Sequence, residues 1–404
     1  MSPDSITGNF LRQFLPRSQR RNIKTILESI QAVFTHGRLT ITGIARWMKR
    51  GATVKSQIKR IDRLVSHPGL HRDLIDIAAK IARKLLPSSS LLIVDWTPYG
   101  PHHALVASIP HQGRAIPIYF EVHPEKMLGN ATVEQRFLDI LEKHIIPENV
   151  KPIVVTDAGY RNPWFKKVLS LGWHVVGRAL SRVLAQPCEE EGEVWWHMTV
   201  LHDRATNIPT DHGWWRLARR NPMPLRIISL KRRSKRLKSQ KRGPSPRGGT
   251  TASRHRRRAM QPWMLVTSVA GVSAATVVSW YQQRMWIEEQ FRDDKNIDTG
   301  IGLNQSRSTS LGNLQGLRML GLLTTLLTHC VGIVGERLGL QRKVQVNTVT
   351  ERRGLSLPYL GRQLLFHEDR RQFSLARLNQ ALNTIRQEAA VSLDTEMEEN
   401  LLAA

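Results

Sequence analysis

In the stretch Leu91-Leu-Ile-Val-Asp95, four apolar residues in a row are followed directly by an aspartate. Pro152-Ile-Val-Val-Thr-Asp157 repeats this pattern further along the chain. Short apolar runs of this kind are typical of buried central strands that deliver a polar residue at their end. We therefore expect Asp95 and Asp157 at the C-terminal ends of two adjacent strands.

The elements expected around these strands predict a mixed sheet. Segments 103–109 and 115–122 flank a His-Gln-Gly-Arg turn and are expected to form a hairpin. The other expected elements are a helix from the N-cap Asn130 to Ile146, a helix that begins at Asn162-Pro163, and a strand at 173–178. A hairpin joined to parallel strand–helix units predicts a layered α/β domain.

A third carboxylate lies on a helix that Ser273 can cap and that is expected to reach residue 295. Four of its residues are spaced 3, 4 and 7 apart, and at about 100° per residue they fall within roughly 60° of one another. These four are Tyr281, Arg284, Glu288 and Lys295. A carboxylate flanked by two cations and a phenol suits a metal-bound phosphodiester. Glu289 lies about 100° round the helix, so Glu288 is the predicted third carboxylate.

Asp95, Asp157 and Glu288 together form the predicted catalytic centre. Taken singly, a strand-end aspartate is more often a cap and a helical glutamate is usually solvated, so only the combination is specific. Oxygen ligands favour Mg²⁺, with Mn²⁺ as a substitute, over zinc. One or two such ions can activate an attacking hydroxyl and stabilise the leaving oxygen.

The charge of the chain indicates a polyanionic partner. Its 60 Lys and Arg residues against 33 Asp and Glu give a formal net charge of +27. Nucleic acid is the first candidate and an anionic membrane the second. The apolar stretches 263–280 and 314–338 are interrupted by polar residues, and we interpret both as buried elements of a protein with no membrane span.

The expected compartment is a reducing one, the cytoplasm. The start of the chain lacks the apolar core and cleavage site of a secretory signal. Cys188 and Cys330 are the two cysteines, too few for a four-cysteine zinc module, and both are expected to fill core positions.

Residues 18–86 are expected to form helices rich in basic residues. Two periodic apolar runs, 39–48 and 52–65, are joined by a short turn that contains Gly51. This pattern is compatible with a helix-turn-helix whose second helix presents four basic residues to DNA: Lys55, Lys59, Arg60 and Arg63. The alternative is an ordinary helical hairpin with a solvated basic face, and the net charge favours DNA contact.

Beyond residue 178, Trp-rich and Pro-rich pieces predict short antiparallel strands. Lys231–Arg258 holds 13 Lys or Arg and no acidic residue, which indicates a disordered or DNA-ordered loop, the alternative being a solubilising loop. A strand is expected at 263–266, and the last hundred residues are expected to be helical with an acidic tail at 394–400.

Three groups of residues resemble the DDE transposases of insertion sequence family 4, closest to the transposon-ten branch. They are Val94-Asp95-Trp96, Thr156-Asp157-Ala-Gly-Tyr160, and the Tyr-Arg-Glu-Lys signature at 281, 284, 288 and 295. The resemblance covers nearly the whole chain. It implies an RNase H-like catalytic domain at 91–178 and 263–300 that is interrupted by a β-rich insertion at 179–262. A helical DNA-binding domain at 1–86 would precede it, and a helical region at 301–404 would follow.

The resemblance also implies a mechanism and partners. Water nicks each end of the element, the freed 3′-hydroxyl forms a hairpin with the opposite strand, the hairpin is opened, and the 3′-ends join target DNA. The implied partners are double-stranded DNA, as terminal inverted repeats and as target, and a second copy of the chain in a homodimer. Trp263 matches the position of a tryptophan that receives a flipped base in relatives, with a core tryptophan as the alternative.

Other classes of function fit less well. The sequence has no Gly-x4-Gly-Lys-Ser/Thr phosphate loop, and the pairs His102-His103 and His202-Asp203 lack a second cluster at metal-ligand spacing. Tyr281 is a weaker candidate for a covalent nucleophile than for a phosphate contact. A silent DNA-binding repressor has no need of converging carboxylates, and the signature of a nucleic-acid packaging protein fits only residues 231–258.

Overall fold

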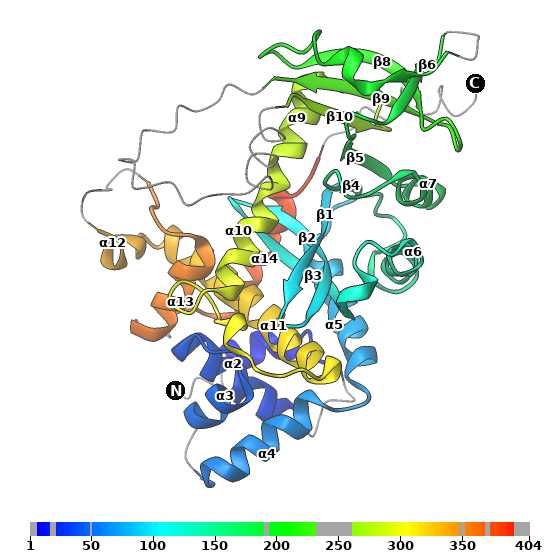
Figure 1. The fold of residues 1–404 in the computed structure, drawn as a ribbon. Coiled ribbons are helices and arrows are strands. Elements are labelled where there is room, and N and C mark those ends of the chain that lie inside the picture. Colours follow the sequence, from blue (N-terminus) through cyan, green and yellow to red (C-terminus); the bar gives the residue numbers. More distant parts are fainter. Residues whose placement is uncertain are drawn as a thin grey trace, which may run out of the picture. The chain divides into compact units, whose positions relative to one another are not determined.

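The computed structural model describes residues 6–16, 22–48, 51–189, 194–231, 261–346, 348, 352–367 and 372–391 (Figure 1). The basic loop after Lys231 and the acidic tail lie outside the described residues. Contacts divide the chain into two compact units. The first unit holds residues 1–152 and 283–392, and the second unit holds residues 153–282 and 393–404.

An antiparallel meander forms the sheet of the first unit. Its strands are β1 (Leu91–Tyr99), β2 (His102–His111) and β3 (Arg114–Pro124). The β2–β3 hairpin is confirmed, and its turn places Gln112 at φ 45° and Gly113 at φ 84°, as two-residue hairpin turns require. Asp95 pairs with Val106 in the middle of β1, so the expectation that it ends the strand is wrong. The strand continues because residues 96–99 pair with β2 as far as His102.

Helices make up most of the first unit. They are α1 (Ile6–Arg12), α2 (Ile23–His36), α3 (Ile41–Trp47), α4 (Val54–Val65), α5 (Leu70–Leu85), α6 (Ala131–Ile140), α10 (Met285–Lys295), α11 (Leu311–Arg337), α12 (Gln341–Val344), α13 (Leu357–His367) and α14 (Leu375–Glu388). Asn130 caps α6 as predicted, and a π-helical turn extends that helix to Ile145. Helix α10 contacts all three strands. On the opposite face, Trp96 Nε1 donates to Glu134 of α6 at 3.0 Å, so helices cover both faces of the sheet.

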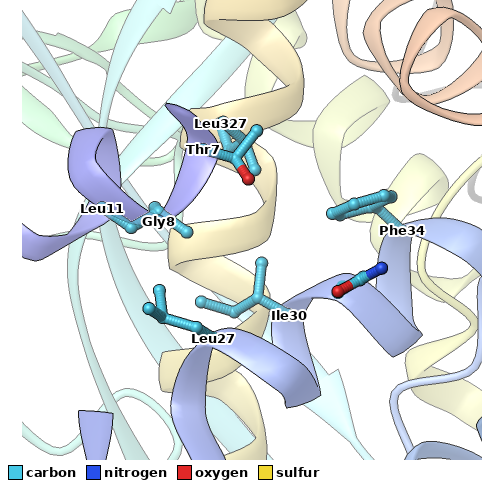
Figure 2. Close-up of a pocket in the computed structure, with 8 residues that line it drawn as sticks. Thr7, Gly8, Leu11, Leu27, Ile30, Phe34 and Leu327 are labelled. Carbon is cyan, nitrogen blue, oxygen red and sulfur yellow. The ribbon is translucent and has the colours of Figure 1, made fainter. Parts of the chain in front are cut away.

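Helix α11 forms the core of the first unit. It is the one described helix that is long and apolar enough to cross a membrane. Its most apolar part is completely buried inside the protein, as expected for a core helix. Helix α13 crosses it closely, because a Cβ on Gly332 would lie 2.2 Å from the carbonyl oxygen of Leu357. Figure 2 shows Leu327 of α11 beside residues of α1 and α2. The cavity that these residues line has a volume of only about 10 Å³, so this junction is well packed.

A second group of strands forms the sheet of the second unit. In spatial order they are β4 (Ile153–Val155), β5 (His174–Arg178), β10 (Trp263–Thr267), β9 (Met223–Leu230), β8 (Thr210–Leu217), β6 (Leu184–Pro187) and β7 (Trp196–His197). Strands β4 and β5 are parallel and the other pairs are antiparallel, which confirms a mixed α/β fold with short antiparallel strands after residue 178.

The described part of the second unit includes the α-helices α7 (Asn162–Ser170) and α9 (Ala274–Gln283), although Gln283 itself is grouped with the first unit. Ser273 Oγ accepts from Thr276 N–H at 3.1 Å, so the predicted cap of α9 is confirmed. The two cysteines differ in burial. Cys330 is buried in α11 as expected, whereas Cys188 is only half-buried because it follows β6 near the edge of the sheet.

Candidate active site

Arg284 joins two of the three predicted carboxylates within the first unit. Its guanidinium lies 3.3 Å from Asp95 Oδ2 and 2.5 Å from Glu288 Oε1. The side chains of Asp95 and Arg284 are 15% and 10% exposed, while that of Glu288 is 44% exposed. A largely buried cation therefore bridges a half-buried carboxylate on β1 and a more accessible one on α10.

The predicted continuous helix is interrupted at Arg284. Helix α9 ends at Gln283 and α10 begins at Met285, although the backbone of Arg284 stays helical at φ −52° and ψ −35°. Ile287 N–H donates to Arg284 O, a three-residue bond that replaces the four-residue bond of an α-helix. Arg284 and Glu288 remain one helical turn apart, so they still share a helix face, and they form an ion pair that was not predicted.

Lys295 is held to the Asp95 side of β1. Its ammonium donates to Thr97 Oγ1 at 2.8 Å, and Thr97 shares a strand face with Asp95 because it is two residues further along. Burial lowers the pKa of Lys295, the buried Arg318 lowers it further, and Asp294 opposes both effects. Sequence reasoning missed Thr97, although the two-residue period of a strand would have pointed to it.

Two ion pairs anchor α10, one partly buried and one fully buried, and neither was predicted. Arg114 Nε donates to Asp293 at 2.6 Å, and Arg318 of α11 lies 3.9 Å from Asp294, which also accepts from Gln290 at 2.7 Å. Their partners are far apart in sequence, so no local pattern could reveal them. These pairs fix the helix that carries Glu288.

Glu289, the competing carboxylate, pairs with Arg292 at 2.7 Å, and the Arg292 side chain is 69% exposed. This pair lies on the solvated side of α10. Glu289 therefore serves as the natural control for Glu288.

Asp157 belongs to the second unit, two residues beyond β4. Its Oδ1 accepts from Gly159 N–H at 2.7 Å, which fixes the loop that follows. Among the described residues no group of three or more His, Cys, Asp or Glu side chains is arranged to hold a metal ion. The convergence of Asp157 with Asp95 and Glu288 remains a prediction.

Trp263 and Tyr281 pack together in the second unit. Their rings lie edge to face with centroids 5.0 Å apart, and Trp263 is 7% exposed. Trp263 is thus a packing residue of β10 in this conformation. A role in holding a flipped base would require its ring to become accessible.

The predicted helical pair at the N-terminus is present as α3 and α4, capped by Thr40 and Thr53. Three of the four candidate DNA-binding residues on α4 are exposed, namely Lys55, Lys59 and Arg63. Arg60 instead donates to Thr25 at 2.9 Å and to Glu28 at 3.0 Å on α2. Its charge is therefore used within the protein.

A comparison with known families matches residues 88–320, more than half of the chain, to the family described as Transposase DDE domain. The matched range includes all three predicted carboxylates. A comparison with curated proteins found no match.

Proposed function

The chain belongs to the transposase DDE domain family, and we propose that it moves an insertion sequence by a cut-and-paste reaction. The reaction comprises strand cleavage, hairpin formation and strand transfer at terminal inverted repeats. The bridged pair of Asp95 and Glu288 supports this proposal, because it brings acidic groups from strand and helix to one cation in a single unit.

We propose Asp95, Asp157 and Glu288 as the ligands of Mg²⁺, with Mn²⁺ as a substitute. The donor set fits, since all donors are carboxylate oxygens and two of them already meet a positive charge at Arg284. When bound, the metal would activate the attacking water or 3′-hydroxyl and stabilise the leaving oxygen.

The basic residues of the site would handle the phosphate. Asp95 and Glu288 would hold the metal, and the planar guanidinium of Arg284 would donate two hydrogen bonds to a phosphodiester. Lys295, held by Thr97, would contribute a second cation on the same side of β1. Tyr281 is the further phosphate contact that the signature implies.

The proposed function also requires a surface that binds the DNA of the terminal repeats. The exposed Lys55, Lys59 and Arg63 lie at four-residue intervals, which places them along one face of α4. We propose that this face contacts the phosphate backbone of a terminal repeat. Two copies of the chain would hold the paired ends in the cytoplasm.

Glu288→Gln and Glu289→Gln form the matched test of this proposal. Each is incubated with Mg²⁺ and DNA that carries the element's own terminal inverted repeats, and nicked, hairpin and joined products are separated by size. Glu288→Gln should abolish all three products, whereas Glu289→Gln should retain them. Equal activity of the Glu288 variant and the wild type would refute the assignment. If the wild type binds the ends but never cuts them, the alternative of a silent repressor derived from a transposase is favoured.

A further inference from the structure

The β8–β9 hairpin of the second unit (Figure 1) has a turn that carries two adjacent arginines. The turn is Ala218-Arg-Arg-Asn221, and both arginine side chains are exposed. Asn221 N–H donates to Ala218 O at 3.0 Å and closes it. Two positive charges therefore project from a closed turn.

The backbone of this turn adopts an uncommon conformation. Ala218 has φ 64°, and the only other described residue besides glycine with positive φ is Gln112. Residues with a Cβ rarely adopt a positive φ, and turns usually have Gly or Asn at such a position. Such a conformation persists only where the surrounding structure imposes it.

Hydrogen bonds to neighbouring segments hold the turn around Ala218 in this conformation. The Asn162 amide at the start of α7 donates to the carbonyl oxygens of Leu217 and Asn221, each at 3.1 Å. The Lys166 ammonium donates to the Asn221 side chain. From the other side, Ala218 N–H donates to Leu184 O at 2.8 Å. The arginine pair is thus displayed on a turn that is fixed before any ligand binds.

The turn is fixed to the segment that also carries Asp157. Asn162 follows Asp157 by five residues in the same unit, and five residues span at most about 18 Å. Arg161, which is exposed, adds a further cation next to Asn162. We propose that Arg219 and Arg220 form a DNA phosphate-binding site that holds the backbone of the duplex beside the Asp157 loop.

The chemistry of the pair suits a phosphate partner. A guanidinium can donate two parallel hydrogen bonds to a phosphate, and two adjacent guanidinium groups can engage successive phosphates. A fixed turn avoids the entropic cost of ordering the site when DNA binds. The inference rests on the proposed function, because it assigns the pair to the DNA of the same reaction.

The double variant Arg219→Ala, Arg220→Ala tests the charge of the site. Its matched control is Arg342→Ala, Lys343→Ala, an exposed adjacent basic pair on α12 of the first unit. The affinity of the full-length protein for a short duplex of arbitrary sequence is measured over a series of salt concentrations. The Arg219/Arg220 variant should bind more weakly and lower the slope of log affinity against log salt by about 2, since each phosphate contact contributes about 0.9. An equal change in both double variants would overturn the proposal, as would no change in either.

Asn162→Ala tests the positioning of the pair. Both arginines remain in this variant, so the salt slope should stay near that of the wild type while affinity falls several-fold. Unchanged affinity would show that the turn needs no support from α7. The same variants are then assayed for cleavage of the element's ends. If the wild type cuts but the Arg219/Arg220 variant binds and cuts equally well, this inference fails and the proposed function stands. If the wild type neither binds nor cuts, both fail.

Discussion

The guanidinium of Arg284 lies 3.3 Å from the carboxylate of Asp95, a residue 189 positions earlier in the chain. The same group reaches Glu288 at 2.5 Å. Arg284 therefore relieves the repulsion between these carboxylates. This arrangement makes Arg284 important for stability as well as for phosphate contact.

Arg284→Met should lower the free energy of unfolding in metal-free buffer by about 1–3 kcal/mol, because it leaves the half-buried Asp95 without this partner. Arg292→Met is the matched control on the same helix, and its exposed pair with Glu289 should contribute less than about 1 kcal/mol. Urea denaturation measures both values. Added Mg²⁺ should raise the melting temperature of Arg284→Met more than that of the wild type, since no guanidinium competes for the carboxylates. Equal losses in the two variants would contradict this account.

A buried histidine pair makes the stability of the first unit depend on pH. His111 Nδ1 lies 2.8 Å from His329 Nε2, and His111 Nε2 lies 3.1 Å from Glu388. Burial lowers the pKa of His111 to about 4, an effect that Glu388 opposes and Arg353 supports. Burial lowers the pKa of His329 well below its usual value, and the charges of His111, Arg353 and Arg114 add to this.

Both rings are therefore neutral in the folded protein at pH 5, whereas in the unfolded chain they take up protons near pH 6.5. The stabilisation is present above pH 6.5 and is lost as the pH falls toward 4. Each histidine should remove about 2 kcal/mol of stability between pH 7 and pH 5. His329→Gln should shrink this loss by about 2 kcal/mol, while His144→Gln, at an exposed position, is the control. Urea denaturation at pH 7 and pH 5 measures the unfolding free energy of each variant. A loss in His329→Gln equal to that of the wild type would refute the prediction.

Local patterns in the sequence predict the elements well but not how their side chains pair. The Gln112-Gly113 turn and the Asn130 and Ser273 caps could be predicted because their signals span only a few residues. The apolar run before Asp95 predicts a strand that ends at this aspartate, but β1 continues to Tyr99. That error arose because residues 96–99 gain their strand conformation from pairing with β2, which the run itself does not encode.

The candidate site shows the same limit. The spacing of Arg284 and Glu288 predicts that they share one helix face, but not that they form an ion pair. The bond from Lys295 to Thr97 spans 198 positions and depends on how α10 packs on the sheet. Net charge likewise predicts DNA contact in general, but it cannot separate a basic residue that faces solvent from one that faces a buried partner.

We expect substitution of Trp263 to lower the stability of the second unit. Its ring is 7% exposed and packs against Tyr281, so Trp263→Ala should cost roughly 3–5 kcal/mol of unfolding free energy. Trp196 is 46% exposed on β7, and Trp196→Ala should cost less than about 1 kcal/mol. Denaturation of the two variants compares them directly, and a similar small loss in both would contradict the packing role. Trp263→Phe is then the suitable variant for testing base stacking, because it preserves an apolar ring.

Arg60 and Lys59 are neighbours on α4, and we expect their substitution by alanine to affect different properties, stability for Arg60 and DNA affinity for Lys59. Arg60 donates to Thr25 and Glu28, so Arg60→Ala should lower the unfolding free energy by roughly 1–2 kcal/mol. Lys59 is exposed, so Lys59→Ala should leave stability within about 0.5 kcal/mol of the wild type. On DNA the order reverses, because a phosphate contact by Lys59 would lower the salt slope by about 1. Urea denaturation and fluorescence anisotropy on a duplex over a salt series measure the two effects. If Lys59→Ala binds DNA with the affinity and salt slope of the wild type, the ordinary helical hairpin with a solvated basic face is the better description of α3 and α4.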